Sequence, residues 1–340
     1  MILVIAEKPS VAQSIAKVLG ATTRKDGYME GGNYIVSWCF GHLVELADAS
    51  SYDERYAKWR YDDLPIVPES WMFEVTKDKS QQFKVLSALM KDKRVTELVC
   101  ATDAGREGEL IFRLVYDKAG CTKPFKRLWI SSLEDSAIRE GFNHLRDGKE
   151  YDRLYEAALS RSKADWIVGI NGTRLFTTLY HKKLVVGRVQ TPTLAMLVER
   201  DGKISTFQKE KYFNVHVGKG DLTADLEKVK TEEEAKKITA ACEKKQAVVS
   251  SLRQETKTVN PPKLYDLTTL QREANRYYGF TAQQTLDLVQ TLYEKKLLTY
   301  PRTDSQFITD DMEDTARQVI SIVCRQLPLF SGVSVTPDIA

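Results

Sequence analysis

The chain has 340 residues and carries 50 Lys and Arg side chains against 47 Asp and Glu, which gives a formal net charge of +3. Apolar residues make up 42% of the chain and charged residues 29%, ordinary values for a globular protein. They exclude a wholly disordered chain, a collagen-like fibre and a highly basic packaging protein. At roughly 150 residues per domain the length predicts two or three domains. No apolar run approaches the roughly 18 residues of a membrane span, so no membrane partner is expected.

The five cysteines, Cys39, Cys100, Cys121, Cys242 and Cys324, show no CxxC spacing. The sequence therefore gives no support for a structural zinc ribbon. A disulfide framework is not expected in a chain of this length, so we expect a reducing, cytoplasmic location.

Strand-like runs alternate with helical patterns over the first 150 residues. Ile2–Ala6 is a short continuous apolar run of the kind that forms a buried parallel strand. Leu98–Thr102 and Lys126–Ile130 are further expected strands, and a helix is expected after each. This alternation predicts a parallel α/β sheet over residues 1–150. The expected helices are Val11–Leu19, a segment through Leu110 to Gly120, and Asp135–Leu145, the last with Ser131 and Glu134 in capping-box spacing.

Three further segments follow. Residues 151–207 are mostly helical, residues 208–262 suggest a small β-rich element with a helix on its surface, and residues 263–340 resemble a winged-helix module. The expected helices are Tyr151–Tyr180, one capped by Thr191 with Pro192 in its first turn, one starting at Thr231, Leu267–Tyr278 and Thr281–Lys296. The expected strands are Tyr212–Val217, Ala247–Leu252 and Leu297–Tyr300.

Acidic side chains gather where two of the predicted strands end. Glu7 follows the first strand, Asp103 follows another, and Glu107 and Glu109 come within the next helical turn. Ligands of open parallel sheets bind at the carboxyl ends of the strands, and Mg²⁺ prefers one or two carboxylates. Acids at a helix start are also favoured by the helix dipole alone. The pattern therefore predicts a magnesium site but leaves open that the two glutamates are solvated helix-start residues.

The segment around Tyr300 is the most unusual run in the chain. Pro301 holds Tyr300 extended, and Arg302 lies two residues on, which in an extended strand puts it on the same side. An adjacent guanidinium favours the phenolate and can hold a phosphate by two parallel hydrogen bonds. The pair is suited to nucleophilic attack on a phosphodiester. An isolated Tyr-Pro-Arg segment is also consistent with a core tyrosine at a strand end and a surface arginine.

A basic stretch without any Asp or Glu runs from Trp166 to Val198. Lys, Arg, Thr, Asn and Gln side chains are those that contact nucleic-acid phosphates, as helix N-termini do. The stretch predicts a nucleic-acid contact, although a helical segment that lacks acids by chance would look similar. Its basic and amide residues are Arg174, Lys182, Lys183, Arg188, Asn171 and Gln190.

Taken together, six blocks of the sequence resemble those of type IA DNA topoisomerases, closest to the branch of bacterial topoisomerase III. The blocks occur in the family's order and cover nearly the whole chain, which makes coincidence improbable. They are Leu3–Ser10, Trp38–Leu43, Ala101–Glu109, Arg161–Trp166, Gly187–Leu194 and Thr299–Ser305.

The resemblance implies specific roles. Tyr300 would attack a single-stranded DNA phosphodiester and form a 5′-phosphotyrosine link, so that strands pass and rejoin without ATP. Arg302 would orient the scissile phosphate, while Glu7 and Lys8 would assist proton transfer and charge stabilisation at the leaving 3′-hydroxyl. The outcome would be relaxation of negative supercoils or decatenation. The implied DNA contacts are Arg161, Asp165, Arg174, Gly187, Arg188, Val189, Gln190, Thr191 and Pro192.

The resemblance also implies a Mg²⁺ ion held by Glu7, Asp103 and Glu107. The family often has a second Asp where this chain has Gly105, so one carboxylate is missing. Glu7 or Glu109 could supply the lost oxygen. Metal binding is therefore expected to be weaker than in relatives with the full set.

The implied domains are a Toprim metal-binding domain over 1–150, part of a helical DNA-binding domain over 151–207, part of a β-rich hinge over 208–262, and a truncated winged-helix-like domain over 263–340. Relatives continue well beyond the position of Ala340, so we expect a fragment or a split gene that binds DNA without relaxing a plasmid. A bacterial cytoplasmic location, at the nucleoid or on plasmids, is implied. Two alternatives are a DNA-binding module without turnover and a Toprim-type nuclease or primase.

Overall fold

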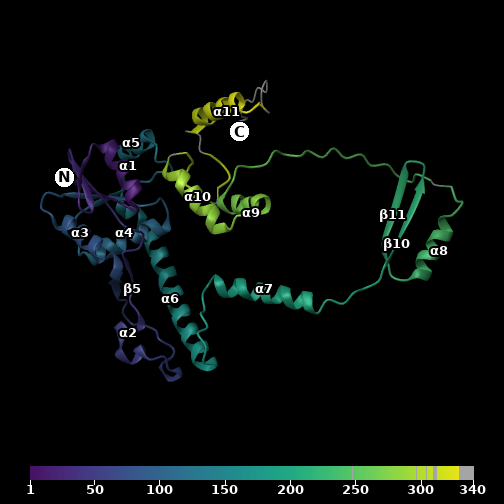
Figure 1. Cartoon of the computed structure of the whole chain (residues 1–340), viewed down its shortest axis with the longest axis horizontal. Helices are drawn as coiled ribbons and strands as arrows, with labels where there is room; N and C mark the ends of the chain where they lie inside the picture. Colours follow the sequence, from purple (N-terminus) through teal and green to yellow (C-terminus); the bar gives the residue numbers. More distant parts are fainter. Residues whose placement is uncertain (247, 296, 304, 309–311, 329–340) are drawn as a thin grey trace. The chain divides into compact units, whose positions relative to one another are not determined.

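The structure is a computed structural model that describes residues 1–246, 248–295, 297–303, 305–308 and 312–328. The chain divides into two compact units (Figure 1). The larger comprises Met1–Val186 with Pro262–Ala340, and the smaller comprises Gly187–Pro261. Within the described ranges, no helix is long and apolar enough to cross a membrane.

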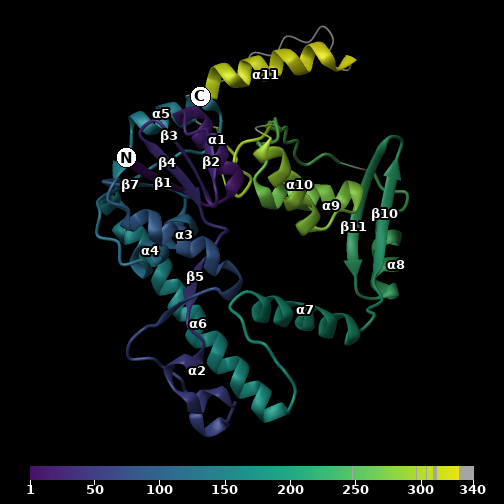
Figure 2. The same cartoon turned by 60° about the vertical axis from the view of Figure 1, so that its left-hand side comes forward.

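A mixed sheet forms the centre of the larger unit (Figure 2), with the strand order β2-β3-β4-β1-β7-β8-β9. The central strands β4, β1, β7 and β8 run parallel, whereas β2, β3 and β9 pair antiparallel at the two edges. The predicted parallel sheet is thus confirmed for the centre, and the antiparallel edges were not foreseen. The strands are β1 (Ile2–Ala6), β2 (Thr23–Lys25), β3 (Tyr28–Gly31), β4 (Tyr34–Trp38), β7 (Glu97–Ala101), β8 (Phe125–Arg127) and β9 (Arg146–Asp147).

Alternate residues of β1 enter two separate hydrophobic clusters, one on each face of the sheet. Leu3 and Ile5 pack with side chains of α3 (Ser80–Lys91) and α4 (Arg106–Lys118). Val4 and Ala6 pack with α1 (Pro9–Leu19) and α5 (Asp135–Asn143) on the other face. All four β1 residues are fully buried, and each large aliphatic side chain contributes about 1.5–3 kcal/mol. The end of β1 is therefore a rigid place to mount a functional side chain.

The helices that follow the central strands begin and end close to the predicted residues. Gly20, the residue after the predicted helix Val11–Leu19, ends α1 in the left-handed conformation that favours glycine, with φ of 75°. The expected capping box at Ser131 is wrong: Glu134 occupies the cap position of α5, and the backbone N–H of Glu134 donates to the Ser132 hydroxyl instead.

An extension of the sheet domain, residues 47–72, lies along the long helix α6 (Asp152–Tyr180); we call it the strap. It joins the two strands of a hairpin, β5 (Val44–Leu46) and β6 (Phe73–Val75). Figure 1 shows the strap's short helix α2 (Ala49–Tyr52) beside the lower part of α6. Nothing in the sequence patterns predicted this element, because its short turns and mixed polarity show no regular period.

The last part of the larger unit contains α9 (Leu267–Tyr278), α10 (Ala282–Glu294) and α11 (Glu313–Gln326). Thr281 and Gln284 form a reciprocal capping box at the start of α10. The predicted strand Leu297–Tyr300 is wrong, since the described residues there form bends. Pro301 has no N–H for a sheet ladder, and the Tyr300 ring packs against the sheet domain instead.

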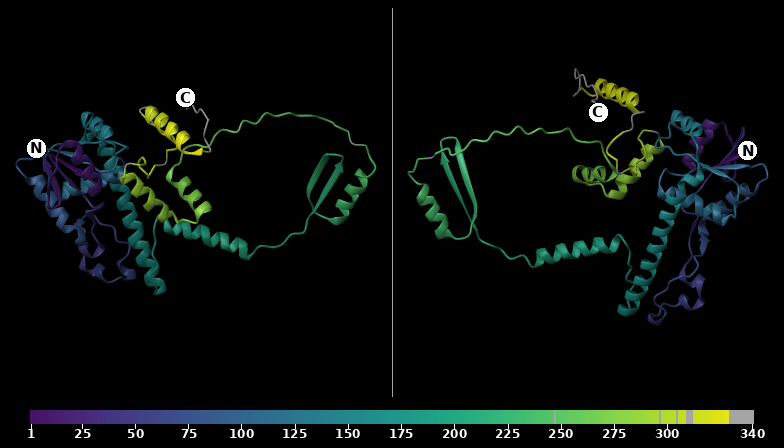
Figure 3. Two further views of the ribbon diagram at one scale, coloured as in Figure 1. Left: turned by 45° about the horizontal axis from the view of Figure 1, so that its top comes forward. Right: turned by 180° about the vertical axis from the view of Figure 1, so that it is seen from behind.

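The smaller unit contains α7 (Gln190–Ser205), the antiparallel pair β10 (Phe213–Lys219) and β11 (Leu222–Val229), and α8 (Glu232–Cys242) (Figure 3). Apolar residues of the hairpin and α8 form a small core of their own. Thr231 caps α8 as predicted, whereas α7 begins at Gln190, so Thr191 lies inside its first turn rather than at its cap. The predicted strand Ala247–Leu252 is wrong for 248–252, which have no regular structure; Ala247 lies outside the described residues.

Candidate active site

Glu7 and Asp103 lie at the carboxyl ends of two adjacent parallel strands, β1 and β7. The backbone N–H of Asp103 donates to Glu7 Oε2 over 3.3 Å. Burial, and next to it the negative charge of Asp103, raise the pKa of Glu7 to about 7 from an ordinary 4.5. The chain therefore holds two acids close together without full compensation, a feature typical of functional sites.

The Tyr300 hydroxyl donates to Asp103 Oδ2 over 2.7 Å, which joins groups 197 positions apart in the sequence. The Tyr300 ring packs edge-on against that of Tyr293, with centroids 5.6 Å apart. Burial and the Asp103 carboxylate raise the pKa of Tyr300, and the opposing effect of Arg302 is weaker. The expectation that Arg302 favours the phenolate is thus outweighed here, because the phenol faces a carboxylate and is held neutral.

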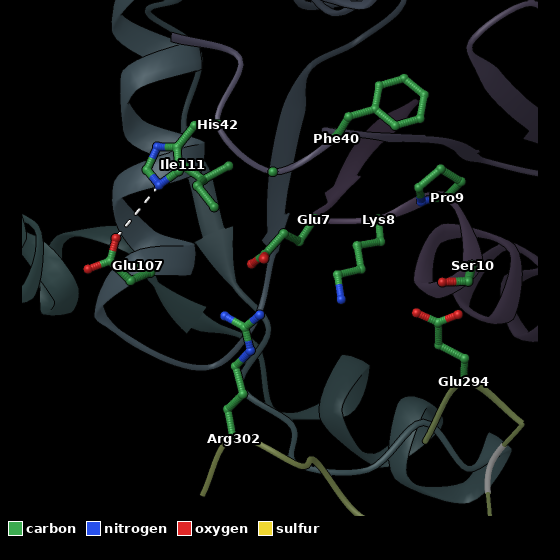
Figure 4. Close-up of a pocket in the computed structure, with 11 residues that line it drawn as sticks. Glu7, Lys8, Pro9, Ser10, Phe40, His42, Glu107, Ile111, Glu294 and Arg302 are labelled. Carbon is green, nitrogen blue, oxygen red and sulfur yellow. Dashed lines mark ion pairs between the residues drawn. The ribbon is translucent and has the colours of Figure 1, made fainter. Parts of the chain in front are cut away.

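A cavity of about 740 Å³ opens beside these groups, and Figure 4 shows the side chains that line it. Glu7, Lys8 and Arg302 point into it from the end of β1 and from the tyrosine segment. The cavity wall therefore carries both an acidic and two basic side chains. A proton donor and cations that can bind phosphate lie side by side there. Further lining residues are Ser10, Phe40, His42, Glu107 and Glu294.

Glu107 and Glu109 stand two residues apart on α4 but have different environments. Glu107 lines the cavity, and its carboxylate lies 3.7 Å from His42 Nε2. Glu109 is completely buried, 2.9 Å from Arg113 Nε and 3.1 Å from Arg127 Nε. Glu109 therefore cannot supply the metal oxygen that Gly105 lacks, because each of its oxygens is paired with a guanidinium group.

Arg127 also fixes the backbone that carries Asp103. Its guanidinium is fully buried and donates to the carbonyls of Cys100, Thr102 and Asp103 over 3.0, 2.7 and 2.6 Å. Hydrogen bonds from a charged donor are about twice as strong as neutral ones. The buried Arg127 side chain thus fixes the loop at the end of β7, which limits how far the Asp103 carboxylate can move.

A divalent cation needs oxygen ligands, and the carboxylates of this site are candidates. Within the described parts of the chain, no cluster of three or more His, Cys, Asp or Glu side chains is close enough to hold a metal ion. Glu7 and Asp103 are adjacent, and burial together with the negative charge of Asp103 raises the pKa of Glu7; a cation would offset that charge. Two carboxylates with water suffice for Mg²⁺. The donor set fits such an ion, with Glu107 on the wall of the same cavity.

Three of the predicted DNA contacts lie on α6. Arg161 and Asp165 are partly exposed. Arg174 is not available at the surface: it is 3% exposed, and its guanidinium donates to the Tyr56 carbonyl of the strap over 2.7 Å. Desolvation lowers the pKa of Arg174. A direct contact between Arg174 and DNA does not fit this arrangement, in which the guanidinium supports the strap.

The other predicted DNA contacts form the loop that opens α7 in the smaller unit. Gly187 N–H donates to Thr191 Oγ1 over 3.0 Å, and Thr191 N–H donates to the Gly187 carbonyl over 3.1 Å. These bonds close a turn at the N-terminus of α7, where backbone N–H groups favour anions. The residues from Arg188 to Pro192 are all exposed.

The sequence interpretation assigned no role to several side chains of the cavity. Phe40 and His42 belong to the second family block, so that block was the signal available for them. Glu294 ends α10, and Ser10 lies in the first turn of α1. No pattern singled out Glu294, because only the folded chain brings α10 to the end of β1.

Comparisons with known proteins agree with this geometry. A family model described as "DNA topoisomerase" matches residues 149–333, and one described as "Toprim domain" matches residues 2–133. The chain is 47% identical over 320 residues to "DNA topoisomerase 3" of Staphylococcus haemolyticus, covering 93% of this chain and 45% of that protein. It is 45% identical over 323 residues to "DNA topoisomerase 3" of Bacillus subtilis, covering 93% of this chain and 44% of that protein.

A solved structure has a similar fold. It is the full-length topoisomerase I from Thermotoga maritima, with a TM-score of 0.66 and 26% sequence identity, covering 94% of this chain and 52% of that one. The chain thus spans about half the length of the curated relatives and of the solved structure that it matches.

Proposed function

Because the chain belongs to the DNA topoisomerase family, as the six sequence blocks predicted, we propose that it carries out the cleavage and rejoining of one DNA strand. The observation that carries the proposal is the hydrogen bond from the Tyr300 hydroxyl to Asp103, whose backbone N–H in turn bonds to Glu7 of the cavity wall. A nucleophile, an acceptor for its proton and two phosphate-binding cations lie within one site.

The proposed reaction begins with attack of Tyr300 Oη on a phosphorus atom of single-stranded DNA. Asp103 Oδ2, which already accepts the phenolic hydrogen bond, takes the proton. The bond from phosphorus to the 3′-oxygen breaks, and a 5′-phosphotyrosine link remains. Glu7, with a pKa of about 7, is suited to give a proton to the leaving 3′-oxygen. Lys8 and Arg302, on the cavity wall, would hold the phosphate oxygens.

Glu7 and Asp103, with Glu107 nearby, would hold the Mg²⁺ ion that a Toprim domain normally binds. A bound Mg²⁺ ion would offset the charge of the carboxylates and of the phosphate. The protein's own groups would still position the phosphate and move both protons. We propose that religation follows the reverse path, with Glu7 accepting the proton of the 3′-hydroxyl.

We propose DNA as the partner, in the form of single-stranded segments of negatively supercoiled or catenated duplex. The phosphotyrosine ester keeps the energy of the broken bond, so no ATP is needed. Arg161 and Asp165 on α6, with the turn from Gly187 to Pro192, would contact the strand. The relatives are bacterial proteins, which supports a location in the bacterial cytoplasm with the DNA.

We propose that the four parts of the chain predicted from the sequence have separate roles. Residues 1–150 would bind metal, 151–207 and 263–340 would hold the strand and supply the tyrosine, and 208–262 would act as a hinge element.

Incubation of the protein with end-labelled single-stranded DNA, followed by denaturation, tests the proposal. We expect a covalent adduct with the full chain and none with Tyr300→Phe. Tyr293→Phe is the matched control, because Tyr293 is the neighbouring buried tyrosine and its ring keeps its packing. Binding without an adduct would favour a module without turnover. Metal-dependent cutting that survives Tyr300→Phe would favour a Toprim-type nuclease.

A further inference from the structure

Basic and aromatic side chains alternate at the tip of the strap, in the run Lys58–Trp59–Arg60–Tyr61. Trp59 is 42% exposed and Tyr61 is 57% exposed. Tryptophan is highly buried on average, so an exposed indole on a structured element is informative. Exposed rings among cations are the usual equipment for holding single-stranded nucleic acid, because every base has a face that stacks.

The strap is fastened to α6 by side chains of α6 itself. Trp166 Nε1 donates to the Ala47 carbonyl over 3.0 Å. The Asn171 amide accepts from the Ile66 backbone N–H over 2.6 Å and donates to the Ile66 carbonyl over 2.8 Å. With the bond from Arg174 to Tyr56, these contacts hold the strap at three separated points.

These contacts give two residues of the acid-free stretch a structural role. Asn171 and Arg174 looked like groups for nucleic-acid phosphates, but the folded chain uses them to bind the strap's backbone. Exposed basic and aromatic groups also lie at the strap's tip, where Trp59 contacts Arg174.

Trp59 is held in place by a cation beneath it. The Arg174 guanidinium carbon lies 5.3 Å from the Trp59 ring centroid, and the guanidinium is fixed by its bond to the strap. This cation–π contact orients the indole before any ligand arrives, and a preorganised ring loses less entropy on binding. The indole remains partly exposed in spite of this contact.

The cations of the tip are free to bind. Lys58 and Arg60 are exposed and have no hydrogen-bonding, ionic or ring partner among the described residues. Arg55, by contrast, is already engaged with Tyr56 and Asp53. Of the acids after the tip, Asp62 is exposed and Asp63 is half-buried, so the positive charge is confined to the tip itself.

We propose that the tip of the strap is a binding site for single-stranded DNA, separate from the cavity lined by Glu7, Lys8 and Arg302. Trp59 and Tyr61 would stack on bases, while Lys58 and Arg60 would contact the adjoining phosphates. The proposal rests on the proposed function and extends it. Val44, which starts β5, follows two residues after His42 of the cavity wall, so one hairpin leads from the cavity to the strap. A strand bound in the cavity would need extra length to reach the tip.

Two labelled oligothymidylates, of about 6 and about 16 nucleotides, test the proposal with the full chain in chelator, so that binding is measured without cleavage. Loss of one stacked base lowers affinity by roughly 5- to 150-fold. We expect Trp59→Ala to weaken binding of the long oligomer by this factor and to leave the short one within experimental error. Trp59→Phe should restore most of the loss, because it keeps a stacking ring.

Tyr61→Ala and Arg60→Gln give independent readouts, since both side chains are exposed and neither has a hydrogen-bonding, ionic or ring partner in the described parts of the chain. Arg60→Gln should reduce the slope of log affinity against log salt by about 0.7, the value for one phosphate of a single strand. Val67→Ala is the matched control: Val67 is a 59% exposed apolar residue of the same strap without a ring. It should bind like the parent chain.

Full-strength binding of the long oligomer by Trp59→Ala, or by Tyr61→Ala and Arg60→Gln together, would overturn the proposal. Equal losses on a duplex of the same length would also overturn it, because duplex bases are not open to stacking. The adduct assay on the short oligomer reports on Tyr300 alone. A length-dependent loss in a chain that forms no adduct would therefore sustain the strap site while the proposed reaction failed.

Discussion

Two groups of acids at the same edge of the sheet behave in opposite ways. Glu109 is completely buried, but Arg113 and Arg127 bind both of its oxygens. Glu7 and Asp103 face each other and the phenol of Tyr300, and burial with mutual repulsion raises the pKa of Glu7 to about 7. The difference shows that compensation of charge, rather than residue type or depth, separates an acid that stabilises the fold from one available for chemistry.

The ion-paired network around Glu109 also supports the pair formed by Glu7 and Asp103. Arg127 binds Glu109 and, through the Thr102 and Asp103 carbonyls, the loop that presents the Asp103 carboxylate. Arg113 extends the network to the start of α6, where it bonds to Asp152 over 2.7 Å. A rigid, neutral network beneath an uncompensated pair keeps the pair together despite its repulsion.

The largest effect that tests the comparison is a loss of stability in Glu109→Gln. Removing one partner of a buried ionic network leaves uncompensated buried charge and costs about 3–5 kcal/mol. We expect the free energy of unfolding, measured in urea, to fall by this amount. An unchanged free energy of unfolding in this variant would mean that Arg113 and Arg127 find other partners.

Glu97→Gln is the control for that change. Glu97 pairs with Lys126 across neighbouring strands of the same sheet over 3.2 Å, but both side chains reach solvent. Exposed ion pairs contribute about 0–1 kcal/mol, so this variant should unfold close to the parent. A similar loss in both variants would remove the distinction between compensated burial and surface pairing.

The second test uses the pH dependence of stability in metal-free buffer. The pKa of Glu7 is about 7 in the folded chain against an ordinary 4.5, so the folded state binds a proton more tightly than the unfolded one. Stability from this group is complete below pH 4.5 and is lost as the pH rises through about 7. The total loss is about 3 kcal/mol.

Glu7→Gln should remove this loss, because glutamine cannot ionise. The free energy of unfolding of the variant minus that of the parent should increase from pH 4.5 to about 7. Above pH 7 this difference should stay constant. Glu107→Gln is the comparison, since Glu107 is largely exposed. A parallel pH profile of Glu7→Gln and the parent would show that the Glu7–Asp103 pair is not strained.

Much of the fold could be predicted from sequence because local patterns determined it. The apolar run of β1, the 3.6-residue spacing of α1 and α4 and the caps at Gly20 and Thr231 depend on neighbours in the chain. The strap and the antiparallel edges could not be predicted, since their short strands are defined by partners far away. Leu297–Tyr300 has strand-like residues, but no partner strand meets it in the described part of the fold.

For the site, residue types were predictable and environments were not. The position of Glu7 and Asp103 after predicted strands suggested a metal site, and Arg302 two residues after Tyr300 suggested a nucleophile that acts on a phosphodiester. Nothing in the sequence distinguished Glu107 from Glu109, because the difference lies in Arg127, a residue on another strand. Likewise Arg174 looked like a DNA contact, and only packing against the strap shows its guanidinium engaged by a backbone carbonyl.

The smallest expected effect comes from adding charge to the uncompensated pair. Gly105 has an extended backbone, with φ of −177°, and a Cβ added there meets nothing within 4 Å. Gly105→Asp should therefore fold normally and place a third carboxylate near Asp103. One unit charge about 4 Å away is worth about 1 kcal/mol in water, or roughly fivefold in affinity. We expect the Mg²⁺ concentration for half-maximal religation to fall by roughly this factor. Gly105→Asn has the same shape without the charge and should leave the concentration unchanged, so an equal shift in both variants would assign the effect to the loop rather than to the carboxylate.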